Sequence, residues 1–199
     1  MKLIDLQDKC WIALSSEGFP GLRHSTWDEV KPDLTQKELE FYGRKFMMPR
    51  LTAWYGDGEY RYSGTVNPAK PMPPSVKAIR DTVESRCSKL PGFGGKDPVL
   101  NSVLINFYRD GKDSVDWHSD DESQLGPTKD NVLIASLTIG NPRKFVLRNK
   151  KTRQKISFEL ETDDLLIMGG QTQKFWEHKI PKTSKKVGER LNLTFRCYK

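Results

Sequence analysis

Cysteine and histidine are scarce in this chain, which has three of each in 199 residues. Cys10, Cys87 and Cys197 lie far apart and form no Cys-x-x-Cys pair, so we expect neither a disulfide framework nor a zinc knuckle. This use of cysteine is typical of a reducing compartment, the cytoplasm or, in a eukaryote, the nucleus. Any metal site that uses histidine therefore has very few candidate ligands.

Long apolar runs are also missing: none approaches the about 20 residues of a membrane-spanning helix, so we expect no membrane partner. The N-terminal segment 1–8 carries acids within its apolar pattern and lacks a small-residue cleavage site, which argues against secretion. Hydrophobic residues make up 36% and charged residues 30%, as in a globular protein with one substantial core. We expect an intracellular monomer.

Acids are absent from one stretch of this basic chain, whose formal net charge is +7. Segment 143–155 holds seven basic residues and no acid, and a second lysine cluster follows His178. Such clusters form either a solvated face or a track for a phosphate backbone. The candidates for backbone contacts are Arg143, Lys144, Lys150, Lys151 and Lys182. Charge alone predicts a polyanion as partner and does not identify a substrate.

Two helices are predicted in the first half of the chain, after an irregular segment 1–34 that contains a short strand or helix. Thr35 with Glu38 resembles an N-terminal capping box, and apolar residues follow until Pro49, which predicts a packing helix. The second helix runs from Pro74 to about Leu90, with an apolar side at helical spacing.

An aromatic-rich hairpin is predicted between these helices, over 49–64, around the turn 56–58. Its aromatic residues are Trp54, Tyr55, Tyr60 and Tyr62. Aromatic residues at a hairpin often form cross-strand packing pairs. An aromatic lid that stacks on nucleobases has the same composition, and the sequence leaves both interpretations open.

From Val99 onward the pattern predicts short strands, near 102–108, 115–120, 132–139, 144–148, 155–160, 164–168, 175–180 and 190–197. Evenly spaced strands of this kind are typical of a sandwich, a barrel or a jelly roll. The predicted fold class is therefore α+β, with two supporting helices and a β core.

A metal site is the first chemical hypothesis. His118 and Asp120 are two residues apart, so in an extended strand both side chains point to the same face. With His178 they would make the two-histidine, one-carboxylate set of non-haem Fe(II) oxygenases. A solvated loop at 118–120 and a packed histidine at 178 are the alternatives.

The last strand supplies a second pattern, because polar and apolar residues alternate strictly along it. The polar residues are Arg190, Asn192, Thr194 and Arg196, which period two places on one face. If that face points into a roll, the two guanidinium groups require anions, and a dicarboxylate ligand would supply them. An ordinary half-solvated strand is the alternative. Leu104, Asn106 and Tyr108 share a face in the same way and are candidates to line the same cavity.

In their order along the chain, these motifs resemble the AlkB family of Fe(II)- and 2-oxoglutarate-dependent dioxygenases. They are Asn106-x-Tyr108, His118-x-Asp120, His178 and the closing segment 190–196. Within the family, segments 49–56, 113–122 and 135–137 are most similar to the third mammalian homologue. The resemblance covers residues 49 onward.

The resemblance implies a double-stranded β-helix (jelly roll) with an N-terminal nucleotide-recognition lid, divided into 1–98 (extension, helices and lid) and 99–199 (catalytic core) of one structural domain. Its implied iron ligands are His118, Asp120 and His178. Its implied 2-oxoglutarate contacts are Asn106, Tyr108, Arg190, Asn192, Thr194 and Arg196. Its implied base contacts are the stacking residue Tyr62, the acids Asp121 and Glu122, and Trp54, Tyr55 and Leu104.

The implied activity is oxidative demethylation of bases such as N1-methyladenine or N3-methylcytosine in single-stranded DNA or RNA. Fe(II) and 2-oxoglutarate are the cofactors and O2 the co-substrate, with succinate, CO2 and formaldehyde as products. An oxygenase of proteins or small molecules and a jelly-roll binding module without turnover remain alternatives. The sequence does not discriminate DNA from RNA.

Overall fold

The computed structural model describes residues 1–41, 43–62, 65–91, 95, 98–121 and 132–198, and at 41, 60–62 and 65–67 it describes the backbone alone. A seven-stranded antiparallel sheet forms the larger layer. Its strands, in spatial order, are β1 (Lys2–Asp5), β2 (Cys10–Ser15), β13 (Leu165–Gly170), β10 (Ile134–Gly140), β15 (Arg190–Arg196), β8 (Ser102–Tyr108) and β5 (Leu51–Gly56).

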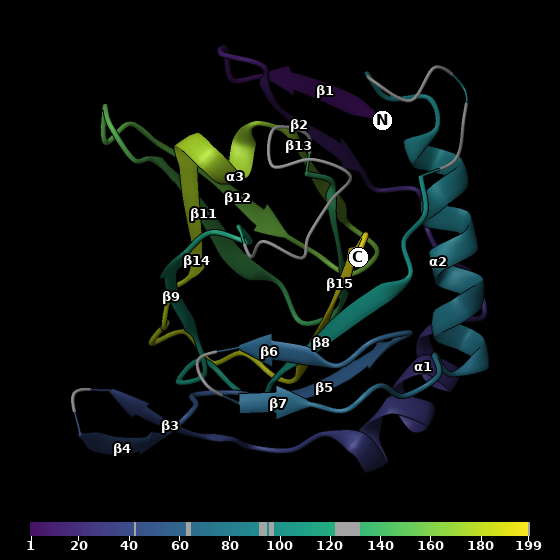
Figure 1. Cartoon of the computed structure of the whole chain (residues 1–199), viewed down its shortest axis with the longest axis vertical. Helices are drawn as coiled ribbons and strands as arrows, with labels where there is room; N and C mark the ends of the chain where they lie inside the picture. The colour runs from purple at the N-terminus through teal and green to yellow at the C-terminus, as the bar shows by residue number, and fades with distance from the viewer. Residues whose placement is uncertain (42, 63–64, 92–94, 96–97, 122–131, 199) are drawn as a thin grey trace.

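A four-stranded antiparallel sheet forms the smaller layer, and the two sheets enclose an apolar interior (Figure 1). Its strands, in spatial order, are β12 (Lys155–Leu160), β11 (Arg143–Asn149), β14 (Trp176–Ile180) and β9 (Val115–His118). Each strand predicted after Val99 is present within a few residues of its expected bounds. The mostly β jelly roll with few helices confirms the predicted fold class.

Helices cover the outer face of the larger sheet, where α2 (Pro74–Cys87) packs beside α1 (Arg23–Val30) (Figure 1). The predicted apolar side of α2 is confirmed, because Val76, Ile79 and Val83 are fully buried there. The larger sheet is thus buried on both faces, which explains why every residue of β15 is buried. A short helix, η1 (Lys31–Asp33), follows α1, and one turn, α3 (Thr172–Phe175), joins β13 to β14.

The predicted helix over 35–48 is wrong. The chain there forms a hairpin of β3 (Glu38–Phe41) and β4 (Arg44–Met47). Gly43 has φ +71, a left-handed value suited to glycine in a tight turn, and Lys45 pairs with Glu38 at 2.9 Å across the strands. Thr35 caps no helix, because its backbone hydrogen bonds with Thr52 of β5.

The predicted aromatic hairpin around 56–58 is also wrong. One edge of β5 pairs with β8, and the other is bridged by Thr35 and Lys70, so neither edge is open to β6. The actual hairpin lies later in the chain and joins β6 (Tyr60–Tyr62) to β7 (Thr65–Asn67).

The N-terminal part of the chain contributes strands to the core sheet. β1 pairs with β2, β2 pairs with β13, and β5 forms the far edge of the same sheet. Residues before position 99 and residues after it therefore share one hydrophobic core. Within the described ranges, no helix combines the length and the apolar character needed to cross a membrane.

Candidate metal centre

Three potential metal ligands meet at one end of the space between the sheets. His118 ends β9 and lies opposite His178 of β14 in the register, and Asp120 follows two residues later. The ligand atoms of His118, Asp120 and His178 all lie within 4.8 Å of one another. Asp120 is 4% exposed and His178 6% exposed, whereas His118 is half-buried. The structure thus brings together the three residues that the sequence predicted as a triad.

Hydrogen bonds hold two of these ligand residues in place. His118 Nδ1 lies 2.8 Å from the carbonyl oxygen of Asp116, which only accepts, so Nδ1 carries the proton and Nε2 keeps its lone pair for a metal. The backbone N–H of Asp120 donates to Gln173 Oε1 at 2.9 Å. Ser119 Oγ donates to the Trp176 carbonyl at 3.0 Å and ties the segment to β14.

The electrostatics of the site favour the protonation states that bind metal. Burial alone would raise the pKa of the Asp120 carboxyl, but the charges of Arg196, His178 and His118 and the Arg196 hydrogen bond lower it to about 2. Burial, together with the nearby His118, lowers the pKa of His178 to about 3. An anionic carboxylate and a neutral imidazole are the forms that coordinate a divalent cation.

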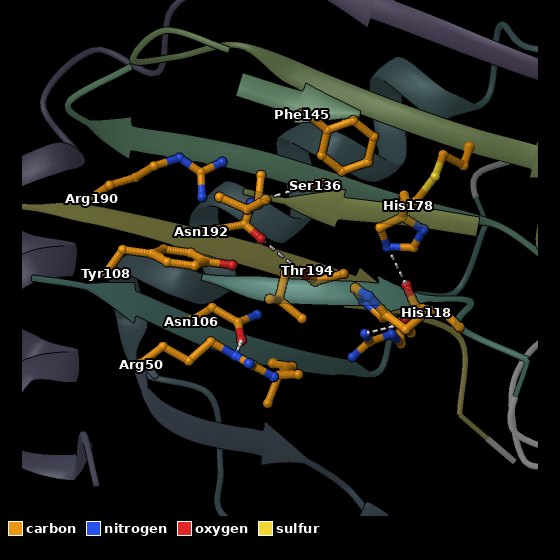
Figure 2. Close-up of a pocket in the computed structure, with 16 residues that line it drawn as sticks. Arg50, Asn106, Tyr108, His118, Ser136, Phe145, His178, Arg190, Asn192 and Thr194 are labelled. Carbon is orange, nitrogen blue, oxygen red and sulfur yellow. Dashed lines mark hydrogen bonds and ion pairs between the residues drawn. The ribbon is translucent and has the colours of Figure 1, made fainter. Parts of the chain in front are cut away.

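A polar cavity extends from this triad along the inner face of β15 and β8. Figure 2 shows the two imidazoles at one end and the Arg190 guanidinium at the other, with Tyr108, Asn192 and Thr194 between them. In the register Arg190 lies opposite Tyr108, and Asn192 lies opposite Asn106. The strict alternation in the sequence therefore does place the polar face inside the roll.

Arg190 is the cationic end of the cavity. It is 1% exposed, and burial lowers the pKa of its guanidinium to about 10, which leaves it protonated at neutral pH. Nη2 donates to Thr138 Oγ1 at 2.9 Å, while Nε and Nη1 have no hydrogen-bond partner among the described residues. A buried cation with two open donors suits an anionic ligand, because a carboxylate oxygen accepts from such a donor. The cavity therefore fits one end of a dicarboxylate such as 2-oxoglutarate.

Arg196 lines the same cavity and interacts with the metal-binding group. It is 3% exposed, and its Nη2 donates to Asp120 Oδ1 at 2.8 Å. This buried ion pair holds the carboxylate in place and keeps it ionised. Direct contact of Arg196 with a bound dicarboxylate remains a prediction, as do the contacts of Asn106, Tyr108, Asn192 and Thr194.

The sequence interpretation missed several residues that shape the site. Arg50, 6% exposed immediately before β5, donates from Nε to Asn106 Oδ1 at 2.7 Å and lines the cavity. Phe145 stacks on His178 with ring centroids 5.3 Å apart. Gln173 accepts a hydrogen bond from the Asp120 backbone, and Thr138 accepts one from the Arg190 guanidinium. Two signals were available in the sequence: an arginine directly before an apolar strand, and the alternation Ser136-x-Thr138, which repeats the pattern of the last strand.

The residues expected to contact a base are not gathered in one place. Leu104 lines the cavity, whereas Trp54 is 4% exposed, packs edge-on against Tyr198 and is not among the lining residues. The prediction that Tyr55 contacts a base is wrong. This residue is buried on the helix side of the sheet, opposite to the cavity, and its hydroxyl donates to Asp33 Oδ2 at 2.7 Å. The Tyr62 side chain and Glu122 lie outside the described residues, and Asp121 is exposed.

The predicted backbone contacts divide in the same way. Arg143 is wrong as a phosphate ligand, because it is 2% exposed and its guanidinium donates to the carbonyls of Asp110, Asp113 and Pro181. The exposed members are Lys144, Lys150, Lys151 and Lys182. The charge run in the sequence thus combined one structural arginine with lysines that face solvent.

Comparison with known proteins places this geometry in a family. The family model described as 2OG-Fe(II) oxygenase superfamily matches residues 26–196. Alpha-ketoglutarate-dependent dioxygenase alkB homolog 3 of Mus musculus is 36% identical over 90% of this chain and 63% of its own length, and the Homo sapiens protein is 38% identical over 90% and 63%.

Two further relatives extend the comparison. DNA oxidative demethylase ALKBH2 of Mus musculus is 30% identical over 96% of this chain and 85% of its own length. The solved chain described as OsALKBH1 superposes with a TM-score of 0.62 at 15% identity, covering 99% of this chain and 100% of that chain, which supports the fold alone. The chain spans less than two thirds of the alkB homolog 3 proteins that it matches.

Proposed function

Because this chain belongs to the AlkB family of the 2OG-Fe(II) oxygenase superfamily, we propose that it demethylates N-alkylated bases in single-stranded DNA or RNA by oxidation. The observation that carries the proposal is the pairing of a His118–Asp120–His178 group with the buried Arg190 cation in one cavity. A binding module without turnover has no need of three convergent ligands beside an unsatisfied buried guanidinium.

The residues present fit both cofactors. His118, Asp120 and His178 would hold Fe(II), and the open donors of Arg190 would bind one carboxylate of 2-oxoglutarate. When bound, these cofactors supply with O2 the oxidising power that converts an N–CH3 group to N–CH2OH, while 2-oxoglutarate becomes succinate and CO2. The N–CH2OH group then releases formaldehyde and leaves N–H on the base.

The chain's own contribution to this reaction is orientation and electrostatics. Gln173 and Arg196 hold Asp120 from two sides, and the stacked Phe145 ring restricts the rotation of His178. Phe145, Met168 and Ile180 give the cavity an apolar wall that limits water near the reacting groups.

Charge supports an alkylated base as substrate. A base methylated at adenine N1 or cytosine N3 is a cation, and the Asp121 carboxylate, directly after the ligand Asp120, is 65% exposed. Lys150 Nζ lies 3.8 Å from this carboxylate. We propose that Asp121 attracts the cationic base, with Glu122 and Tyr62 as further base contacts, and that Lys144, Lys150, Lys151 and Lys182 attract phosphates.

A substrate panel tests the proposal. Matched single- and double-stranded DNA and RNA oligonucleotides, each with one N1-methyladenine or N3-methylcytosine, are incubated with Fe(II), 2-oxoglutarate and O2. Formaldehyde should form only from methylated strands, and faster from single strands. If 2-oxoglutarate is consumed equally with and without the methyl group, the methylated base is not the substrate. If no 2-oxoglutarate is consumed on any strand, the demethylase proposal fails.

A further inference from the structure

A second hollow, larger than the polar cavity, opens beside the metal-binding group. It is a groove of about 570 Å³, within the about 300–1,000 Å³ typical of ligand pockets. The groove shares Arg50, Val115, His118 and Ile180 with the inner cavity, so the two spaces meet at a predicted iron ligand. A molecule positioned over His118 can therefore continue into the groove without crossing the core.

The two walls of this groove differ in chemistry. One wall comes from the β3–β4 hairpin and the residues after it, and apart from Arg50 it is apolar, with Leu39, Phe46 and Met48. The hairpin projects on the same side of the molecule as β9 and β14 (Figure 1). Phe46 is 46% exposed, so an aromatic ring on this wall is open to a ligand. The burial of an exposed aromatic face by a planar base is favourable.

The wall that comes from β9, β14 and the residues after β14 is cationic and aromatic. Lys179 and Lys182 line it together with Trp117, which lies immediately before His118. Lys179 Nζ lies 4.6 Å from the centre of the Trp117 ring, which places this ammonium group at the groove. Arg148 also lies over that ring, at 3.9 Å, but its guanidinium is paired with Glu177 at 2.6 Å. Neither Lys179 nor Lys182 forms an ion pair with a described carboxylate, although Asp116 lies in the same groove.

An apolar wall and a cationic wall in one groove match one chemical unit of the substrate, a nucleotide with a planar base and an anionic phosphate. We propose that this groove binds the nucleotide next to the alkylated one, with its base against Phe46 and its phosphate at Lys179 and Lys182. This inference rests on the proposed function and adds a neighbouring-nucleotide site to it. A base with one face on Phe46 must leave its own stack, so the groove selects single strands over duplexes.

The charged wall is tested by comparing a methylated trinucleotide with the corresponding methylated mononucleotide. Lys179→Ala/Lys182→Ala should lower kcat/KM for the trinucleotide about tenfold more than for the mononucleotide. The salt dependence of trinucleotide binding should also decrease, by about 0.7 in the slope for each phosphate that the variant no longer neutralises. Lys2→Ala/Lys77→Ala removes the same charge from exposed positions outside the groove, on β1 and α2, and is the matched control.

The apolar wall is tested with a neighbour that lacks its base. Phe46→Ala should weaken binding of the normal trinucleotide about tenfold but should leave binding of a trinucleotide with an abasic neighbour nearly unchanged. Met47→Ala is the matched control, because Met47 is the next residue of β4, is 50% exposed and does not line the groove. An equal loss of binding for the normal and the abasic trinucleotide would show that Phe46 does not contact the neighbouring base and would overturn this assignment.

The outcomes separate this inference from the proposed function. If the wild-type protein demethylates neither the trinucleotide nor the mononucleotide, the demethylase proposal fails and the groove has no nucleotide to bind. If the wild-type protein demethylates both, but the groove variants behave like Lys2→Ala/Lys77→Ala and Met47→Ala, the neighbouring-nucleotide site is wrong and the demethylase proposal stands.

Discussion

The inner cavity and the outer groove meet at His118 but are built in opposite ways. The cavity is made of central strands, and its key groups Asp120, His178, Arg190 and Arg196 are all at most 6% exposed. The groove is made of a hairpin, an edge strand and two lysines, of which Lys182 is exposed and Lys179 half-buried. Rigid, preorganised geometry suits bond chemistry, whereas an exposed surface suits exchangeable contacts with a polymer. We therefore expect changes in the cavity to abolish turnover and changes in the groove to adjust substrate choice.

The largest effect should come from the metal-binding group. His118→Ala and Asp120→Ala should each lower formaldehyde release by more than about a hundredfold. Removal of a residue that only hydrogen-bonds to a metal ligand typically lowers activity about 10- to 100-fold, and loss of the ligand itself should have a larger effect. Fe(II) titration of each variant should show the reduced affinity. Gln173→Ala, which removes the hydrogen bond to the Asp120 backbone and a weaker one to Met168 Sδ but no metal ligand, is the graded comparison. Full turnover by Asp120→Ala would remove this residue from the metal site.

The next effect should come from the cationic end of the cavity. Arg190→Met should raise the KM for 2-oxoglutarate at least about tenfold, because the variant cannot form a buried charge pair with the cofactor. The free energy of unfolding without cofactor should stay equal or increase, because the buried guanidinium has two donors without a hydrogen-bond partner among the described residues. Chemical denaturation and cofactor titration measure both quantities. A large loss of stability with an unchanged KM would make Arg190 a structural residue.

The stability of the metal-free protein should decrease in acid because of His178. An unfolded histidine binds a proton near pH 6.5, whereas the pKa of His178 in the fold is about 3. The unfolded state thus binds more protons between these values, and stability falls as pH falls through this window. At pH 4.5 the loss relative to pH 7 should be about 2–3 kcal/mol.

Urea denaturation of the wild type and of His178→Phe at both pH values isolates this contribution to the free energy of unfolding. The variant should lose about 2–3 kcal/mol less than the wild type between pH 7 and pH 4.5. Equal losses in the two proteins would mean that His178 is not buried in its neutral form.

The smallest effect should come from the opposite face of the larger sheet. Tyr55→Phe removes the hydroxyl that donates to Asp33 Oδ2 and should lower the free energy of unfolding by about 0.5–1.5 kcal/mol. Turnover should stay at the wild-type value, since this ring lies on the helix side. Thermal unfolding and initial rates measured on one preparation check both statements. A reduced turnover rate with an unchanged free energy of unfolding would mean that Tyr55 does contact the substrate.

More features of the cavity than of the groove could be predicted from the sequence, and the reason is physical. Period two along β15 and β8 places Arg190, Asn192 and Asn106 on one face, because alternation is a property of each strand by itself. The small number of histidines limited the candidates for the third metal ligand, and the resemblance to the AlkB family selected His178 among them. That Arg196 pairs with Asp120, and Arg50 with Asn106, depends on strand order and could not be read from local pattern.

The groove depends on elements for which local pattern was misleading. The segment 38–47 has apolar residues compatible with a helix, yet Gly43 and cross-strand pairing make it a hairpin that supplies Phe46. Arg143 and Lys144 are neighbours in one basic run, but strand alternation buries the first and exposes the second. Composition counts charges without telling which face of a strand they occupy.

The most direct test of iron- and 2-oxoglutarate-dependent demethylation is the stoichiometry of a single reaction. The wild-type protein, with Fe(II) and O2, receives a single-stranded oligonucleotide bearing one N1-methyladenine, and succinate and formaldehyde are quantified together. One succinate per formaldehyde is expected, with neither formed by His118→Ala. Succinate that forms without formaldehyde, at a rate indifferent to the methyl group, would contradict nucleic-acid demethylation.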